Sequence, residues 1–373
     1  MSGDELRLLV LDEGVLGGRT LMNQLRVAFP ELPGVTVTFV TVPPPSRTER
    51  LLLRRVGFLG DLDLFSLRWR LRWSWRARRA LRRHAGTVDA AFINTQASAL
   101  LARGPMRRTP CVLSVDATAR QYTELAYEGE GDRWSPLQTR ILVALERRAV
   151  NGSGGALAWS RWAADGLRLE GISDAKIATF HPGLDAAWWA AAGRGRRAAG
   201  AGAGPLRLLF VGNDVERKGL GDLIAAVEEL DGLVELDVVT GAEVAGSARV
   251  RVHRGIEGAT PQLAAMYARA EALALPSRAD ASPWVVLEAL AAGLPVLGTR
   301  VGAIPEMVGD AGILVEPGNR EELAAGLREL ADPARRAELA AKAPVQVAAY
   351  DSRTQTGRLV ELLRTIVAER PLR

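Results

Sequence analysis

Cysteine is almost absent from this sequence: among 373 residues, Cys111 carries the only thiol. A single cysteine cannot form an internal disulfide, and it cannot supply the thiolate cluster of a zinc or iron–sulfur site. We therefore expect no oxidising compartment and no metal centre, and we interpret Cys111 as a small buried apolar residue.

Long apolar runs are also lacking. The longest, such as VLEALAAGLPVLGT at 286–299, are broken by charge, Gly or Pro before they reach the roughly 20 residues of a membrane-spanning helix. The first residues, MSGDELRLLVLDEG, place acids before a short apolar stretch, unlike the basic start and longer apolar core of a secretory signal. We expect a cytoplasmic protein, with peripheral binding to the inner face of the membrane as an alternative.

Lysine is rare too, because only Lys176, Lys218 and Lys342 are present. Arginine carries the positive charge, and the net charge is +5. The first 150 residues contain 23 arginines against 15 acidic residues. Much of this surplus lies in LRWRLRWSWRARRALRR, residues 67–83.

If residues 67–83 and their flanks form a helix, they carry two nearly opposite apolar stripes with arginines mostly between them. One stripe can face the core while the other stays outside, where Arg and Trp suit the headgroup layer of an anionic membrane. An ordinary surface helix explains the pattern equally well, and we expect no nucleic acid partner, although nucleic acid attracts the same residues. The stripes are Leu64, Leu67, Leu71 and Trp75, and Trp69, Trp73, Ala77 and Ala80.

Strand-like apolar runs alternate with helical patterns in both halves of the chain. This alternation predicts an α/β fold of two doubly wound, Rossmann-like domains facing a central cleft. We expect a first domain at 1–185, a mobile Gly-, Ala- and Arg-rich linker at 186–205, a second domain at 206–350, and a C-terminal helix at 351–373 that packs back on the first domain. The predicted strands are 6–13, 35–42, 89–95 and 110–118, then 206–213, 233–241, 248–255 and 271–277.

One lysine and two acids of the second half stand out as candidate site residues. Lys218 follows a strand and precedes a helix that begins near Gly219, where a phosphate can meet the helix N-terminus. Asp280 lies in a loop after another strand, and Glu288 lies eight residues later, inside a helix opened by Pro283. Two carboxylates and one ammonium are an arrangement suited to a sugar nucleotide.

These residues, together with VGAIPEMV at 301–308, resemble the family-4 retaining glycosyltransferases of the GT-B fold. The resemblance implies metal-independent transfer of a hexosyl or N-acetylhexosaminyl group from a nucleoside-diphosphate sugar, most often a UDP-sugar, to an unidentified acceptor hydroxyl. It implies that Lys218 binds the diphosphate, Glu288 the ribose and Asp280 the transferred sugar. The backbone near that sugar would be Ala281, Ser282, Pro283 and Trp284.

In the first half, the resemblance places Gly17 and Gly18 beside the diphosphate and the acceptor. Asp116 stands where many relatives carry a histidine, and capping of its own loop is an equally good explanation for it. Asn213 replaces a family arginine, so Arg217 from the neighbouring turn would supply the second cation. The sugar pocket also departs from the family, with Asp280 for Glu and Ala281, Ser282 and Pro283 where glycines are usual.

Other functions compete with glycosyl transfer. A Rossmann oxidoreductase is disfavoured, because EGVLGG lacks the G-x-G-x-x-G spacing and no acid ends the second strand. The remaining alternative is a membrane- or nucleic-acid-binding protein on the same fold without turnover, which Asn213 would also allow.

Overall fold

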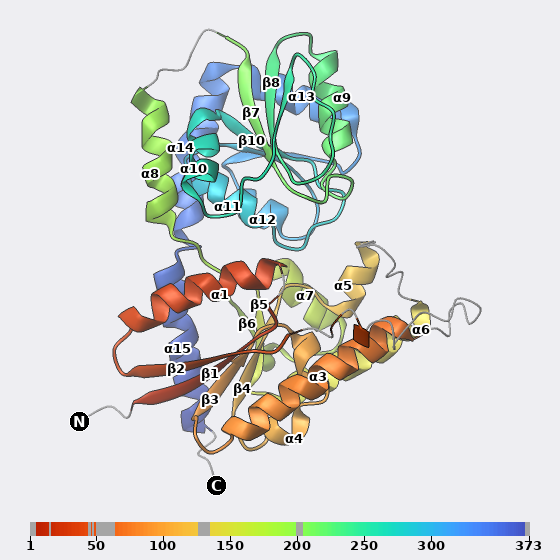
Figure 1. Ribbon diagram of the computed structural model, residues 1–373, viewed down its shortest axis with the longest axis vertical. Helices are drawn as coiled ribbons and strands as arrows, with labels where there is room; N and C mark the ends of the chain where they lie inside the picture. Colours follow the sequence, from red (N-terminus) through yellow and green to blue (C-terminus); the bar gives the residue numbers. More distant parts are fainter. Residues whose placement is uncertain are drawn as a thin grey trace. The chain divides into compact units, whose positions relative to one another are not determined.

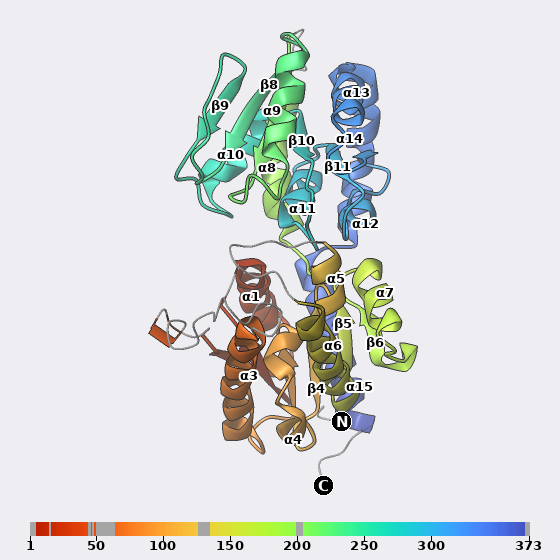
Figure 2. The same ribbon diagram turned by 90° about the vertical axis from the view of Figure 1, so that its right-hand side faces the viewer.

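The computed structural model describes residues 5–14, 16–43, 46, 48–49, 64–125, 135–198 and 204–369. The chain divides into two compact units, Met1–Gly183 with Ser352–Arg373, and Leu184–Asp351. Each unit is an α/β structure built on its own parallel sheet (Figures 1 and 2).

The sheet of unit 1 has the strand order β2-β1-β3-β4-β5-β6, and every neighbouring pair is parallel. Its central strands are buried apolar runs, as expected for a sheet covered on both faces; Cys111 lies in β4 and is fully buried, as predicted. The strands are β1 (Leu6–Asp12), β2 (Val35–Thr41), β3 (Ala90–Ile93), β4 (Cys111–Val115), β5 (Gly155–Ala158) and β6 (Ile177–Thr179).

The helices of unit 1 include the end of the chain. Helix α15 (Ser352–Glu369) packs against α1 and β3, and Arg353 forms an ion pair with Glu31 at 2.8 Å. The other helices are α1 (Leu16–Ala28), η1 (Phe29–Glu31), α3 (Phe65–His84), η3 (Gln96–Ala99), α4 (Arg103–Met106), α5 (Ala119–Glu124), α6 (Pro136–Gly152), α7 (Arg161–Leu169) and η4 (Asp174–Lys176).

Unit 2 repeats this architecture with the strand order β12-β11-β10-β7-β8-β9, again parallel throughout. Its strands are β7 (Leu206–Val211), β8 (Val234–Val239), β9 (Val250–His253), β10 (Ala272–Leu275), β11 (Val296–Thr299) and β12 (Gly312–Val315). Its helices are α8 (Ala186–Ala198), α9 (Leu220–Glu229), α10 (Pro261–Arg269), α11 (Trp284–Ala291), α12 (Ile304–Val308), α13 (Arg320–Ala331) and α14 (Pro333–Ala348).

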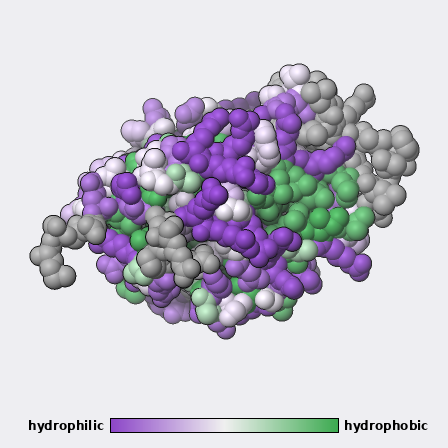
Figure 3. Space-filling model, turned by 90° about the horizontal axis from the view of Figure 1, so that it is seen from below, coloured by the Kyte–Doolittle hydropathy of each residue, from purple (hydrophilic) through white to green (hydrophobic). Residues whose placement is uncertain are grey.

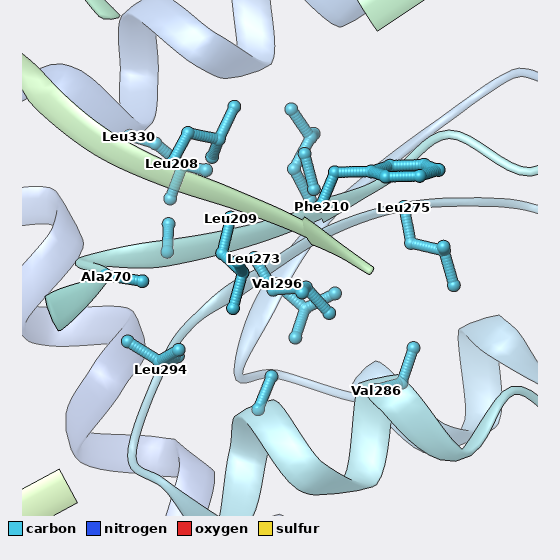
Figure 4. Packing of buried hydrophobic residues seen from close by; sticks show 14 of the residues in the cluster. Leu208, Leu209, Phe210, Ala270, Leu273, Leu275, Val286, Leu294, Val296 and Leu330 are labelled. Atoms are coloured by element: carbon cyan, nitrogen blue, oxygen red, sulfur yellow. The ribbon is translucent and has the colours of Figure 1, made fainter. Parts of the chain in front are cut away.

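The core of unit 2 forms where apolar strand residues meet the covering helices. Leu209 of β7, Leu273 of β10 and Val296 of β11 are fully buried, and Val286 of α11 packs against the same cluster (Figure 4). Such continuous apolar strands are the pattern from which the sequence predicted parallel sheets, and the two doubly wound sheets are confirmed. In the described part of the chain, we find no helix with the length and apolar character needed to cross a membrane.

Helix α8 corrects the expectation of a mobile linker at 186–205. The Ala- and Gly-rich segment is helical to Ala198 and packs on α10 and α11. Its anchor is Trp189, which is 3% exposed and lies edge-on to the Tyr267 ring with centroids 5.0 Å apart. Trp189 therefore attaches this Ala- and Gly-rich helix to the core.

Helix α3 corrects a second expectation, because neither of its apolar stripes is left outside. Trp73, Ala77 and Ala80 are buried in the main core of unit 1, and Leu67 is buried in a second cluster with Leu142 of α6. The reason is that α3 is covered on two sides, by the sheet and by η3 and α6. Of the stripe residues, Trp75 is the exposed one at 47%.

Replacing Trp189 by Ala should lower the free energy of unfolding by about 3–5 kcal/mol, the usual cost of removing a buried aromatic side chain. The matched control is Trp188→Ala, since Trp188 is 37% exposed on the same helix and should change stability by less than about 1 kcal/mol. Urea denaturation measures both. Equal effects of the two substitutions would contradict the packing described for α8.

Candidate functional site

The candidate site of unit 2 lies where the strand order reverses. From β7 the chain proceeds to β8 and β9 on one side, and then returns to β10 on the other side of β7. In such sheets the loops that leave the two strands at the reversal diverge at the carboxyl edge, which is the usual ligand position in doubly wound folds. Lys218 follows β7 and Asp280 follows β10.

Lys218 and Asp280 form a nearly buried ion pair at this edge. The Lys218 Nζ lies 3.0 Å from Asp280 Oδ2, and the two side chains are 13% and 8% exposed. The lysine side chain passes directly over Gly212, where a β-carbon would lie 2.3 Å from Lys218 Cδ. Gly212 therefore provides the space through which the ammonium reaches the carboxylate.

Backbone contacts fix the loop that carries Asp280. Gly302 adopts φ +55°, and a β-carbon there would lie 2.0 Å from the Asp280 carbonyl oxygen. The next residue, Ala303, donates its N–H to the Ala281 carbonyl at 2.9 Å. Only a residue without a side chain fits this close approach, so the turn at 301–303 holds the Asp280 loop in place.

Arg217 adds a second cation to the pair. Its Nη1 lies 3.3 Å from Asp280 Oδ2 and donates to the Ala279 carbonyl at 2.7 Å, while its Nε donates to Asp214 at 2.7 Å. Asn213, by contrast, is exposed, and its side-chain oxygen accepts the Gly241 N–H at 2.8 Å. Asn213 thus joins the ends of β7 and β8, and the cation comes from Arg217.

Glu288 lies inside α11 and is buried, with 9% exposure. The Tyr267 hydroxyl donates to Glu288 Oε2 at 2.7 Å. Burial raises the pKa of Glu288 to about 7, while the Tyr267 hydrogen bond and the positive charge of Lys218 oppose the increase. Lys218 and Asp280 are therefore in direct contact, whereas Lys218 acts on Glu288 through its charge.

The segment 281–284 connects Asp280 to α11. Ala281 is buried, Pro283 is the N-cap of the helix, and Trp284 is its first residue. The Ser282 hydroxyl lies 3.7 Å from Met307 Sδ. This segment therefore links the Asp280 loop directly to the helix that carries Glu288.

The raised pKa of Glu288 has a consequence for stability. The folded chain keeps this proton to higher pH than the unfolded chain, so the stability due to the group is present at low pH and is lost as pH rises from about 4.5 to about 7. At about 1.4 kcal/mol per pKa unit, the loss is on the order of 3 kcal/mol. Urea unfolding of wild type and Glu288→Gln at pH 5 and pH 8 should show this loss in the wild type alone; a stability difference that does not change with pH would contradict it.

In unit 1, Gly17 and Gly18 lie in the first turn of α1. A β-carbon on Gly18 would lie 2.7 Å from Asn94 Nδ2 and 3.4 Å from Glu13 Oε1. Asn94 follows β3 and is 2% exposed, and no hydrogen-bond partner for its Nδ2 occurs among the described residues. Gly18 is therefore required for Asn94 and Glu13 to lie against α1.

Asp116 lies just after β4, at the same edge of the first sheet. Its carboxylate accepts from the Tyr122 hydroxyl at 2.5 Å and from the Ala117 N–H at 2.9 Å. Burial raises its pKa, and burial together with the charge of Asp116 raises the pKa of Glu13 well above normal, while Arg70 of α3 opposes both shifts. Asp116 holds its own loop, which is one of the two explanations that the sequence offers. It also influences the ionisation of Glu13 at the same edge of the sheet.

Four residues that the sequence does not single out lie beside the predicted ones or act on their charge: Tyr267, Asn94, Glu13 and Arg70. In the sequence, Arg70 is one arginine among many in residues 67–83, and nothing in the spacing of Tyr267 and Glu288 relates them. Glu13 and Asn94 lie at the carboxyl ends of the predicted strands 6–13 and 89–95, and this position was the available signal. Within the described ranges, no group of three or more His, Cys, Asp or Glu side chains is arranged to hold a metal ion.

Family models match both units. A model described as Glycosyltransferase Family 4 matches residues 17–188, and one described as Glycosyl transferases group 1 matches residues 205–332.

Curated relatives show the same similarity. Glycogen synthase of Mycobacterium tuberculosis is 32% identical over 205 residues, covering 50% of this chain and 48% of the relative. D-inositol 3-phosphate glycosyltransferase 1 of Catenulispora acidiphila is 26% identical over 380 residues, covering 92% and 85%. The chain spans about half the length of the first curated relatives that it matches.

Solved structures share the fold over nearly the whole chain. Sucrose-phosphate synthase of Thermosynechococcus elongatus has a TM-score of 0.74 at 18% identity, covering 98% of this chain and 100% of that one. Anabaena HepE in complex with UDP-glucose has a TM-score of 0.67 at 17% identity, covering 96% and 100%. At these identities the similarity shows the fold alone.

Proposed function

The chain belongs to glycosyltransferase family 4 and has the GT-B fold, and from this premise we propose that it transfers a sugar from a nucleoside-diphosphate sugar to an acceptor hydroxyl. The observation that carries the proposal is the group formed by Lys218, Arg217 and Asp280 at the β7/β10 reversal. Two cations at this position suit a diphosphate that gains negative charge as the glycosidic bond breaks.

Each side chain then has a role that follows from its chemistry. Lys218 and Arg217 bind the diphosphate and stabilise the leaving group, without requiring a metal ion. Asp280 accepts hydrogen bonds from hydroxyls of the transferred sugar, and Glu288 accepts them from the ribose, because a carboxylate forms short, charge-assisted hydrogen bonds with hydroxyl groups. The segment 281–284 lies along the sugar in this proposal. Gly17 and Gly18 contribute to binding of the diphosphate and the acceptor, and Asp116 to binding of the acceptor or the donor.

The finer points of the proposal follow from the family. We propose a retaining hexosyl or N-acetylhexosaminyl transfer with a UDP-sugar as donor. Support for uridine comes from the structural neighbour HepE, which was solved with UDP-glucose and with UDP. Configuration at the anomeric carbon of the product, read by NMR, tests retention, and unchanged turnover in excess EDTA tests independence from metal.

Lys218→Ala and Glu288→Ala should each slow the release of UDP from UDP-glucose by on the order of 10²-fold or more, because each removes a positioned charge contact. The matched control is Lys342→Ala, which removes the other lysine of unit 2 from an exposed pair with Glu338 and should stay within about twofold.

UDP at 100 times its dissociation constant should also stabilise the wild type by about 2.7 kcal/mol. A wild type that does not bind UDP, or a Lys218→Ala variant of full activity, would refute the proposal.

We further propose that α3 contacts the anionic surface at the inner face of a membrane. Trp75 is exposed and Arg79 lies over its ring, 4.8 Å from the centroid; Arg68, Arg72, Arg82 and Arg83 are exposed on the same helix. Seen from below, the molecule shows a hydrophobic area next to strongly hydrophilic residues (Figure 3). Since the Trp69 and Trp73 stripe is packed inside, the arginines and Trp75 alone support this contact.

More protein should therefore sediment with phosphatidylglycerol vesicles than with phosphatidylcholine vesicles, and Trp75→Ala should reduce that fraction by about half or more. Trp188→Ala, which removes an exposed tryptophan of unit 2, serves as the control and should have no effect. Equal sedimentation with both kinds of vesicle would exclude the contact.

A further inference from the structure

A groove between α5 and α6 of unit 1 is lined by arginines that have no role in the proposed reaction. Its volume is about 580 Å³. The two helices lie side by side, and the Thr123 and Thr139 hydroxyls join them at 3.1 Å (Figure 2). The described residues that line it are Arg120, Thr123, Glu124, Pro136, Thr139, Arg140, Val143, Ala144 and Arg147.

Three arginines surround this groove without an ion-pair partner in the described part of the chain. Some arginines elsewhere are paired with two acids, such as Arg335 with Glu329 and Glu338, and Arg249 with Glu228 and Asp231. Arg120, Arg140 and Arg147 are exposed, and Glu124 is the one acid among the described lining residues; outside the lining, the charge of Arg120 also acts on Glu170. The described lining residues therefore carry a net charge of about +2 at neutral pH.

The helices that present these arginines are held firmly. Arg140, Val143 and Arg147 recur at the three- and four-residue spacing that places them on one face of α6. Helix α5 is fixed by a capping box between Thr118 and Gln121 and by the Ala119 N–H, which donates to Glu146 at 2.9 Å. The backbone of Arg120 is thus already ordered, so binding of a ligand pays no entropy cost for ordering it.

We propose that this groove binds a phosphomonoester. Three guanidinium groups present planar forks that match phosphate oxygens, and the charge of about +2 balances the −1.5 to −2 of a phosphomonoester at pH 7. Pro136, Val143 and Ala144 provide apolar contact for the carbon part of the ligand. The proposal does not rest on glycosyl transfer, because its residues belong to unit 1 and the proposed diphosphate contacts belong to unit 2.

Calorimetric titration of the full chain tests the site with glycerol 3-phosphate as the soluble probe. Arg140→Gln and Arg147→Gln should each raise the dissociation constant about fivefold or more. The matched control is Arg148→Gln, since Arg148 is exposed on α6 next to Arg147 but does not line the groove; it should stay within twofold. Thermal melting verifies that the variants fold.

Flotation with phosphatidic acid vesicles, against phosphatidylcholine vesicles, distinguishes a lipid headgroup from a free ester as the source of the phosphate. Binding to either probe that depends on Arg147 supports the site. Absence of wild-type binding to both, or equal weakening by Arg147→Gln and Arg148→Gln, overturns it. UDP binding by the Arg147→Gln variant should equal that of the wild type. A wild type that binds glycerol 3-phosphate but not UDP would therefore refute the donor proposal and leave the groove proposal intact.

Discussion

The constraint on which the rest of the site depends is the reversal of strand order between β7 and β10. Because both strands are parallel and end at the same edge, their loops bring Lys218 and Asp280 within 3.0 Å across 62 positions of sequence. The carbonyl of Arg217 accepts the Arg278 N–H at 2.8 Å. The two loops are therefore joined by backbone and by charge, and removal of one charge leaves its partner buried and less well compensated.

Features of the fold and the site that depend on local sequence patterns could be predicted, whereas contacts between residues far apart in the sequence could not. The strands were predictable, since buried parallel strands are continuous apolar runs. The positions of Lys218 and Asp280 in loops after strands, and of Glu288 inside a helix, were predicted correctly as well. Helix α8 was not predictable, because its small residues are typical of a linker and its docking depends on Trp189 meeting Tyr267. The Tyr267 contact with Glu288 likewise depends on tertiary packing rather than on periodicity.

The two units have the same sheet topology but different ionisable side chains at the carboxyl edge of the sheet. Each sheet reverses its order once, at β1/β3 in unit 1 and at β7/β10 in unit 2. The edge of the first sheet carries Glu13 and Asp116 under the influence of Arg70, while the edge of the second carries Lys218 and Arg217 paired with Asp280. Since the sheets are alike, the loops decide the charge, in keeping with the rule that function is built on a fold and not implied by it.

Pairing within the site also explains how two cations can stay nearly buried before any diphosphate arrives. Asp280 neutralises Lys218, and Arg217 is held by Asp214 and by the Ala279 carbonyl. A cation left unpaired in this position would destabilise the unit by several kcal/mol. In the proposed reaction, a diphosphate would compete with Asp280 for Lys218, which would lower its net affinity, but the ammonium is already positioned over Gly212. Positioning in advance is what electrostatic stabilisation of a leaving group requires.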